Sequence, residues 1–214
     1  MQTSTCPPKQ TTRFRPGTVD DCYSMAQLFA IASDGVTNYV WHTLRDQYPG
    51  LSPLEIGAAR YADPANMFGY SNCTIAEQSG RIAGMMVTFP IHPAETTSSD
   101  PAPTPPAASA EPDVLAPYNL EAPNTWYICA LAVFPEFRGQ GIGSQLLQVA
   151  HQQAARNGFA ELSLLCFEQN VGALQLYQRN GFKEIDRVAV VPHPLIHHRG
   201  DLLLMTTPVQ QYPL

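Results

Sequence analysis

The sequence lacks the features that mark several common classes of protein. Lys and Arg number 12 against 18 Asp and Glu, which gives a formal net charge of −6, and the basic residues form no run. Because contact with a phosphate backbone needs a basic surface, nucleic acid is not expected as a partner. Residues 1–15 contain no apolar leader segment, and no apolar run reaches membrane-spanning length. We therefore expect neither secretion nor contact with a membrane.

Cysteine is also scarce, and its placement excludes a disulfide scaffold. The five cysteines are scattered, with no spacing typical of a disulfide or a metal site, at Cys6, Cys22, Cys73, Cys129 and Cys166. This usage predicts a reduced, cytoplasmic protein with no metal. A Pro/His run at residues 192–198 has no Cys, Asp or Glu at ligand spacing, and so predicts a solvated loop.

Two stretches are poor in the apolar residues that a core needs. Residues 1–12 are polar and rich in Pro and Thr, and they predict a disordered tail. Residues 93–123 are rich in Pro, Ala, Ser and Thr, which predicts an extended insertion between two adjacent strands. Residues 114–115 and 118–120 could dock this insertion locally. The remainder, residues 13–214, is long enough for one domain with one substantial core.

The apolar pattern predicts strands and helices in an α/β order. Helices are expected at 18–34, 52–61, 143–156 and 171–180, and strands at 13–15, 73–78, 81–89, 126–133, 162–167, 182–191 and 202–205. The run at 162–167 is apolar throughout, which favours a buried, parallel strand. Residues 36–48 are rich in aromatics, which either pack against the core edge or line a substrate mouth. The order indicates a single α/β domain with a mixed sheet.

A glycine-rich turn joins the strand at 126–133 to the helix that follows it. Gly139, Gly141 and Gly143 leave backbone N–H groups unshielded at a helix start, where the helix dipole favours an anion. Residues 137–160 contain Arg138 and Arg156 but neither Asp nor Glu, which makes this region positive in an acidic chain. The turn is therefore expected to hold a phosphate.

Two familiar phosphate-binding motifs fit this turn poorly. The dinucleotide fingerprint Gly-x-Gly-x-x-Gly, counted from Gly139, needs glycine where Ser144 stands, since the third glycine comes one residue early. The phosphate loop of nucleotidases needs Gly-Lys-Ser/Thr, and no lysine lies nearby. Neither motif is therefore predicted here, because each lacks a residue that it requires at a fixed position.

A third pattern, Arg/Gln-x-x-Gly-x-Gly/Ala, matches Arg138-Gly139-Gln140-Gly141-Ile142-Gly143. This turn resembles that of the GNAT superfamily of acyl-CoA-dependent N-acyltransferases. A second family element follows at the right distance, with Asn170, Ala173, Tyr177, Gly181 and Phe182 in Asn-x-x-Ala-x-x-x-Tyr-x-x-x-Gly-Phe. The resemblance is tight over residues 126–182. It implies a mostly antiparallel mixed sheet flanked by helices, and acetyl-CoA as cosubstrate.

The resemblance also implies a set of binding residues. The turn would bind the coenzyme A pyrophosphate through backbone N–H groups, and the preceding strand would pair with the pantetheine and polarise the thioester carbonyl. Asn170 matches a position that hydrogen-bonds the cofactor, although it also suits a helix N-cap. These cofactor-binding residues are Leu131, Ala132, Val133, Arg138, Gly139, Gln140, Gly141, Ile142, Gly143, Ser144, Asn170 and Tyr177.

Tyr177 matches the family tyrosine that protonates the departing thiolate. A phenol with an ordinary pKa of about 10 is protonated at neutral pH and can donate. The alternative role for Tyr177 is core packing on the helix face shared with Val171 and Leu174. A primary amine of a small molecule or peptide would attack the acetyl thioester directly, in a ternary complex. By family analogy, residues 36–48 and 192–198 flank the acceptor.

The general base is missing from its usual place. Residues 125–129 of the strand before the turn offer none, so a water or one of Glu121, His42 and Glu168 could accept the proton. Cys129 is expected to be a small buried residue and not an acyl-carrying nucleophile. The missing base keeps a non-catalytic acyl-CoA sensor open, and a longer acyl group, a hydroxyl acceptor and a homodimer stay open too.

Overall fold

The computed structural model of the protein describes residues 11–93 and 112–210. One seven-stranded sheet has the order β1-β2-β3-β4-β5-β7-β6, and every neighbouring pair is antiparallel except β4 with β5. The strands are β1 (Arg13–Pro16), β2 (Cys73–Gln78), β3 (Arg81–Ile91), β4 (Thr125–Val133), β5 (Glu161–Phe167), β6 (Lys183–Ala189) and β7 (Asp201–Pro208). This confirms the mixed, mostly antiparallel sheet and the parallel β5. Of the tail expected at 1–12, residues 1–10 lie outside the described residues.

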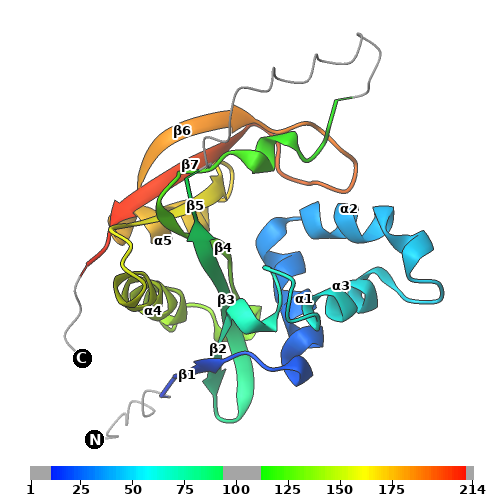
Figure 1. The fold of residues 1–214 in the computed structure, drawn as a ribbon, viewed down its shortest axis with the longest axis horizontal. Helices are drawn as coiled ribbons and strands as arrows, with labels where there is room; N and C mark the ends of the chain where they lie inside the picture. Colours follow the sequence, from blue (N-terminus) through cyan, green and yellow to red (C-terminus); the bar gives the residue numbers. More distant parts are fainter. Residues whose placement is uncertain (1–10, 94–111, 211–214) are drawn as a thin grey trace, which may run out of the picture.

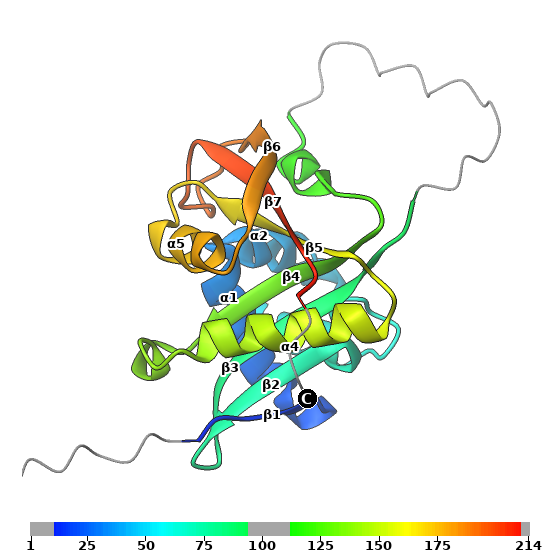
Figure 2. The same ribbon diagram turned by 90° about the vertical axis from the view of Figure 1, so that its left-hand side faces the viewer.

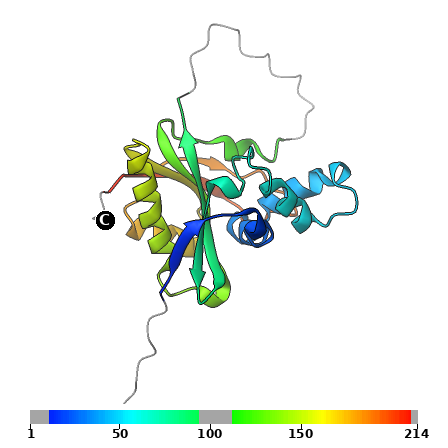
Figure 3. The ribbon, with the colours of Figure 1, turned by 60° about the horizontal axis from the view of Figure 1, so that its bottom comes forward.

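Helices cover both faces of the sheet (Figures 1 and 3). One face carries α1 (Cys22–Ser33), α2 (Val36–Thr43) and α3 (Pro53–Tyr61), and the other carries α4 (Ile142–Arg156) and α5 (Val171–Arg179). Figure 2 shows α4 lying across the strands, with α1 and α2 behind them. No helix in the described parts of the chain is long and apolar enough to cross a membrane.

Each face has its own buried core. Under α4, the fully buried Leu146 and Leu147 pack with Ile128 of β4 and Leu164 of β5. On the opposite face, Met25, Leu28 and Trp41 of α1 and α2 pack on β2, β3 and β4. Burial of side chains of this size stabilises the fold by about 1.5–3 kcal/mol each.

Local sequence signals place several boundaries where they were expected. Ser52 caps α3, with its Oγ accepting from the Glu55 N–H at 3.4 Å while the Glu55 carboxylate accepts from the Ser52 N–H at 2.8 Å. The β2–β3 hairpin turns at Ser79 and Gly80, which have φ of 50° and 73°. Positive φ at both central residues matches the right-handed twist of the strands.

Helix α2 was not predicted, and its formation has a tertiary cause. Residues 36–43 include Val, Thr, Tyr and Trp, which have modest helix propensity. The helix forms because Trp41 is only 1 % exposed and lies against Gly57 of α3, where a Cβ would come within 2.5 Å of the indole. Core packing is therefore one role of Trp41, as the first of the two interpretations of this segment held.

The described end of the insertion docks on the domain. Residues 116–119 form a 3₁₀ turn, η4 (Ala116–Asn119), and Val114 and Tyr118 pack on a third apolar cluster around Phe167 and Ile196. Tyr118 meets Phe167 edge to face with ring centroids 6.2 Å apart. The insertion connects β3 with β4, which are neighbours in the sheet. Residues 94–111 of the insertion lie outside the described residues.

A buried ion pair joins β1 to the start of α1. The Asp21 carboxylate accepts two hydrogen bonds from the Arg15 guanidinium, at 2.7 and 2.8 Å, and two more from the N–H and hydroxyl of Thr18. Asp21 is 4 % exposed. The hydrogen bond from Arg15 is the main reason that the pKa of Asp21 lies below its usual value, with burial acting in the opposite direction.

We predict that Asp21→Asn lowers the free energy of unfolding at pH 7 by about 2 kcal/mol, because it weakens the charge-assisted hydrogen bonds from Arg15 and leaves the half-buried guanidinium with Glu77 as its remaining ion-pair partner. A lowered folded-state pKa gives stability above the unfolded pKa of about 3.9 that is lost as the pH falls through the folded value. Wild type should therefore lose more stability than Asp21→Asn between pH 4 and pH 2. Urea unfolding at both ends of this range measures the difference, with the exposed Asp20→Asn as control. Equal stability of Asp21→Asn and wild type at pH 7 would contradict the prediction.

Candidate active site

The sheet opens between β4 and β5. These parallel strands pair only through Trp126, Tyr127 and Ile128, opposite Leu162, Ser163 and Leu164. Strand β3 pairs with β4 as far as Val133, and a bulge falls at Cys129 because Val87 pairs with Ala130 while Thr88 pairs with Ile128. Within the described residues, the β5-facing edge of β4 from residue 129 to 133 therefore has no strand partner.

A cleft of about 1300 Å³ lies at this opening. All the predicted cofactor-binding residues line it except Gln140, which is exposed beside it. They come from β4, the glycine turn, the first turn of α4 and the first two turns of α5. The cleft thus brings together residues that span positions 131 to 177 in the sequence.

Two of the turn glycines leave open space above the backbone. Gly139 and Gly141 have φ of 75° and 81°, and a Cβ built on Gly139 would meet nothing within 4 Å. A Cβ on Gly141 would meet only the Gln145 amide nitrogen, at 3.8 Å. Gly141 is the N-cap of the 15-residue α4. Positive φ and open access suit a turn whose N–H groups receive an anion.

Gly143 has a different role, because its α-carbon faces a neighbouring helix. A Cβ at this position would lie 3.0 Å from Cδ2 of Leu176 on α5. Glycine therefore lets the first turn of α4 approach α5 closely. This approach brings the start of α4 and the residues of α5 to the same part of the cleft.

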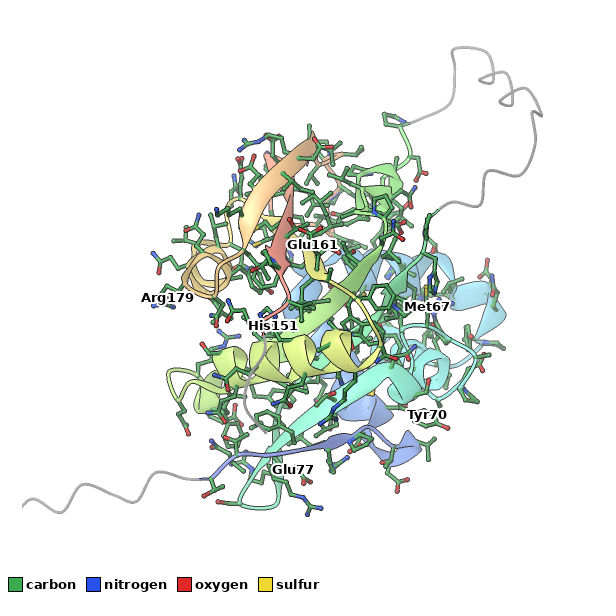
Figure 4. All side chains as sticks on the ribbon, turned by 60° about the vertical axis from the view of Figure 1, so that its left-hand side comes forward. Met67, Tyr70, Glu77, His151, Glu161 and Arg179 are labelled. Carbon is green, nitrogen blue, oxygen red and sulfur yellow. The ribbon has the colours of Figure 1, made fainter. Side chains whose placement is uncertain are left out.

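Charge is distributed unevenly along the cleft. Arg138 lies beside the turn, and Arg179 lies at the end of α5. Among the described residues that line the cleft, the one acid is Glu121, which lies near the other end. The Arg138 Nε donates to the carbonyl of Val133 at 3.1 Å, which fixes the guanidinium next to β4. Arg179 was not predicted from the sequence. In Figure 4 it lies on the same side of the molecule as the start of α4.

Tyr177 is 7 % exposed and contacts both the cleft and the core. Its ring packs against Phe182 with centroids 5.7 Å apart. Burial, and to a lesser extent Cys166, raises the pKa of the phenol above its usual value, so Tyr177 keeps its proton at neutral pH. The packing role and a position for proton donation are therefore compatible.

Asn170 lines the cleft and also caps α5. Its side-chain oxygen accepts from the N–H of Ala173 at 3.2 Å. This is the N-cap role expected from its position. The amide nitrogen of the side chain stays available to a ligand, since the cap uses the oxygen.

One of the three side chains considered as a base lies in the cleft. Glu121 lines it, whereas His42 and Glu168 do not. His42 is exposed beside Arg45, and the Glu168 carboxylate accepts from the N–H of Asp201 at 3.1 Å. Tyr127 lies between Glu121 and the turn, and burial raises its pKa well above the usual value. Tyr127 is therefore a proton donor at neutral pH and not a base.

The Pro/His loop is docked on the domain instead of lying free in solvent. His197 and His198 each place a ring nitrogen 3.4 Å from the Asp34 carboxylate, and His193 packs against Tyr39 with ring centroids 4.6 Å apart. Ile196 is buried in the third cluster. Across the described ranges, no three His, Cys, Asp or Glu side chains are grouped to hold a metal.

Comparison with known proteins decides which family this geometry represents. Residues 37–182 match the acetyltransferase (GNAT) family. The chain belongs to this family. An uncharacterized N-acetyltransferase of Methanocaldococcus jannaschii is 36 % identical over 66 residues, which is 31 % of this chain and 29 % of that relative.

Solved structures share the GNAT fold at low sequence identity. An N-acetyltransferase from Staphylococcus aureus Mu50 superposes with a TM-score of 0.60 at 17 % identity, over 91 % of this chain and 100 % of that one. The protein yncA from Salmonella typhimurium, solved with its cofactor acetyl-CoA, gives 0.55 at 17 % identity, over 95 % and 97 % of the two chains. These structures show the fold, and the family match over residues 37–182 confirms the sequence resemblance to the GNAT superfamily.

Cys129 lies at the bulge of β4 and lines the cleft, so its reactivity as a nucleophile can be tested. Burial raises the pKa of its thiol to about 12. At pH 8 the thiolate fraction is then about 10⁻⁴, against roughly a quarter for a free cysteine. We predict that iodoacetamide labels Cys129 in the folded protein about a thousandfold more slowly than in the urea-unfolded protein. Peptide mass mapping measures both rates, and labelling at equal rates would contradict the assignment of a protonated thiol.

Proposed function

We propose that this GNAT protein transfers an acetyl group from acetyl-CoA to a primary amine of a small molecule or peptide, by direct attack in a ternary complex. The observation that carries the proposal is the cleft itself. It combines an open glycine turn at the start of α4, the unpaired edge of β4 and the buried Tyr177. These parts match the anionic, amide-bearing and thioester portions of acetyl-CoA in that order.

The residues present fit acetyl-CoA along its length. The N–H groups of residues 139–144, with the α4 dipole and Arg138, would hold the pyrophosphate. The free edge of β4 from Leu131 to Val133 would pair with the pantetheine amides like an added strand. Bound acetyl-CoA would supply an activated acetyl thioester at the cleft centre.

The remaining side chains suit the proton transfers of this reaction. Tyr177 keeps its proton at neutral pH and would give it to the departing sulfur. Glu121, or a water beside it, would take the proton that the amine loses. The protonated Cys129 favours direct attack over a covalent acyl-enzyme, because a thiol is a far weaker nucleophile than a thiolate.

We expect Gly141→Ala to weaken acetyl-CoA binding at least about tenfold, because the new methyl group would occupy open space beside the turn backbone, where the pyrophosphate is proposed to bind. Gly158→Ala is the matched control. Gly158 has φ of 79°, a Cβ there meets nothing within 4 Å, and it follows the opposite end of α4. Both variants carry the same left-handed strain of about 1–2 kcal/mol. Isothermal titration calorimetry measures the affinities.

Wild type that fails to bind acetyl-CoA, or equal affinities of Gly141→Ala and Gly158→Ala, would refute the proposed binding mode. A free-thiol release assay over a panel of amines then separates an enzyme from a non-catalytic acyl-CoA sensor. Thiol release that depends on an added amine identifies an enzyme. Binding without release for every amine identifies a sensor.

Tyr177→Phe removes the phenolic proton donor and keeps the packing against Phe182. We expect kcat to fall about a hundredfold while the Kd for acetyl-CoA changes by less than about threefold. The matched control is Tyr23→Phe, because Tyr23 is 51 % exposed on α1 and lies outside the cleft. Steady-state kinetics and calorimetry provide both constants. Full kcat in Tyr177→Phe would leave the residue with a packing role alone.

A further inference from the structure

The cleft continues past β4 to the face covered by α1–α3. We name this part the acceptor arm, and it is lined by Ile31, Trp41, Met67, Phe68, Phe89 and Tyr118, with two charged residues, Arg60 and Glu121. Figure 4 shows Met67 on the side of the molecule opposite Arg179, although both line the cleft. The acceptor arm is therefore the end of the cleft remote from Arg179 of α5.

The walls of the acceptor arm are apolar and aromatic. Phe68 meets Phe89 edge to face with ring centroids 5.8 Å apart, and Phe89 meets Tyr127 in the same way at 5.5 Å. At the rim, Met67 is 50 % exposed and Ile31 is 37 % exposed. Large apolar side chains exposed around a cleft indicate a ligand that covers them, and methionine adapts its shape to such a ligand.

The acceptor arm has no net charge, although its two charged side chains are not paired with each other. Glu121 is the one acid and Arg60 the one cation among the described residues that line it. Arg60 is half-buried and forms no ion pair with any described residue, so its charge is not neutralised locally. A polyamine or an aminoglycoside carries several positive charges and would meet one carboxylate and one opposing arginine. Such walls discriminate against polycations.

The insertion supplies the acid. Residues 112–121 place Leu115, Tyr118 and Glu121 on the cleft, and Tyr118 is held against Phe167 of β5. The hydroxyl of Tyr118 is buried and has no hydrogen-bond partner in the described structure. Docking of Tyr118 thus holds the segment that carries Glu121 against the domain.

We propose that the acceptor arm selects a single primary amine carried on an apolar body of about the size of an aromatic ring, with its ammonium group at Glu121. This inference rests on the proposed acetyl transfer. The ammonium group gives one proton to Glu121, and the neutral nitrogen attacks the acetyl carbon. Glu121 passes this first proton to water. The C–N bond forms as the C–S bond breaks, Tyr177 protonates the sulfur, and the second amine proton returns to Tyr177 through water.

The test compares three amines with the full-length protein at saturating acetyl-CoA. 2-Phenylethylamine has one amine and a ring, ethanolamine has one amine and no ring, and spermidine has several charges. We expect kcat/KM for 2-phenylethylamine to exceed that for either of the others at least about tenfold. Free-thiol release measures all three rates, and calorimetry measures acetyl-CoA binding separately.

Two variants test the walls against matched controls. Met67→Asp should lower kcat/KM for 2-phenylethylamine at least about tenfold, and Ile185→Asp, which is 56 % exposed on β6 outside the cleft, should not. Glu121→Gln should lower it by about a hundredfold. Its control, Glu161→Gln, changes an exposed carboxylate on β5 that does not line the cleft (Figure 4).

The outcomes separate this inference from the proposed function. Failure to bind acetyl-CoA overturns the proposed function itself. Intact binding combined with faster turnover of spermidine or ethanolamine than of 2-phenylethylamine overturns the inference alone. Intact binding with no turnover of 2-phenylethylamine also overturns it. Unchanged rates in Met67→Asp and Glu121→Gln would remove these residues from the acceptor arm.

Discussion

The structure of the site depends on the early end of the pairing between β4 and β5. Beyond Ile128 and Leu164 the two parallel strands no longer share a ladder, although both continue. Backbone groups that leave a ladder inside a protein must find other partners. Here they face a cleft that also receives the start of α4 and the buried side chain of Tyr177. Each part of the proposed catalytic arrangement is therefore placed relative to this opening.

The opening persists because the cores on the two faces are organised differently. On one face, the core under α4 and α5 contains residues of β2, β3, β4, β5 and β7, so it joins both halves of the sheet. On the other face, the core under α1–α3 reaches only as far as β4, and a separate cluster covers the ends of β5 and β7. The halves are thus held together on one side and left apart on the other. The cleft therefore opens between β4 and β5 on one face, while the core on the other face stays continuous.

The residues of the proposed phosphate end could be named from a motif, whereas most residues of the proposed acceptor arm could not, apart from Glu121. Gly139, Gly141 and Asn170 have roles in local backbone geometry, namely positive φ and a helix N-cap, which a short motif records directly. By contrast, Met67, Phe89 and Glu121 come from separate elements that meet only through the sheet order. Helix α2 escaped prediction because it depends on burial of Trp41, and Arg179 because a basic residue at a helix end commonly serves the dipole alone.

The position of Glu121 explains how this chain could work without a base on β4. Thr125 at the start of the strand is 1 % exposed and bonds to Ser163 at 2.6 Å, so a carboxylate there would be buried. Burial of a carboxyl group disfavours its ionised form, which is the form that accepts a proton and attracts an ammonium group. Glu121 precedes the strand and stays exposed, and it reaches the cleft because the insertion docks through Tyr118. In the proposed mechanism, the insertion would therefore supply acceptor chemistry separately from β4 and the glycine turn, which would hold acetyl-CoA.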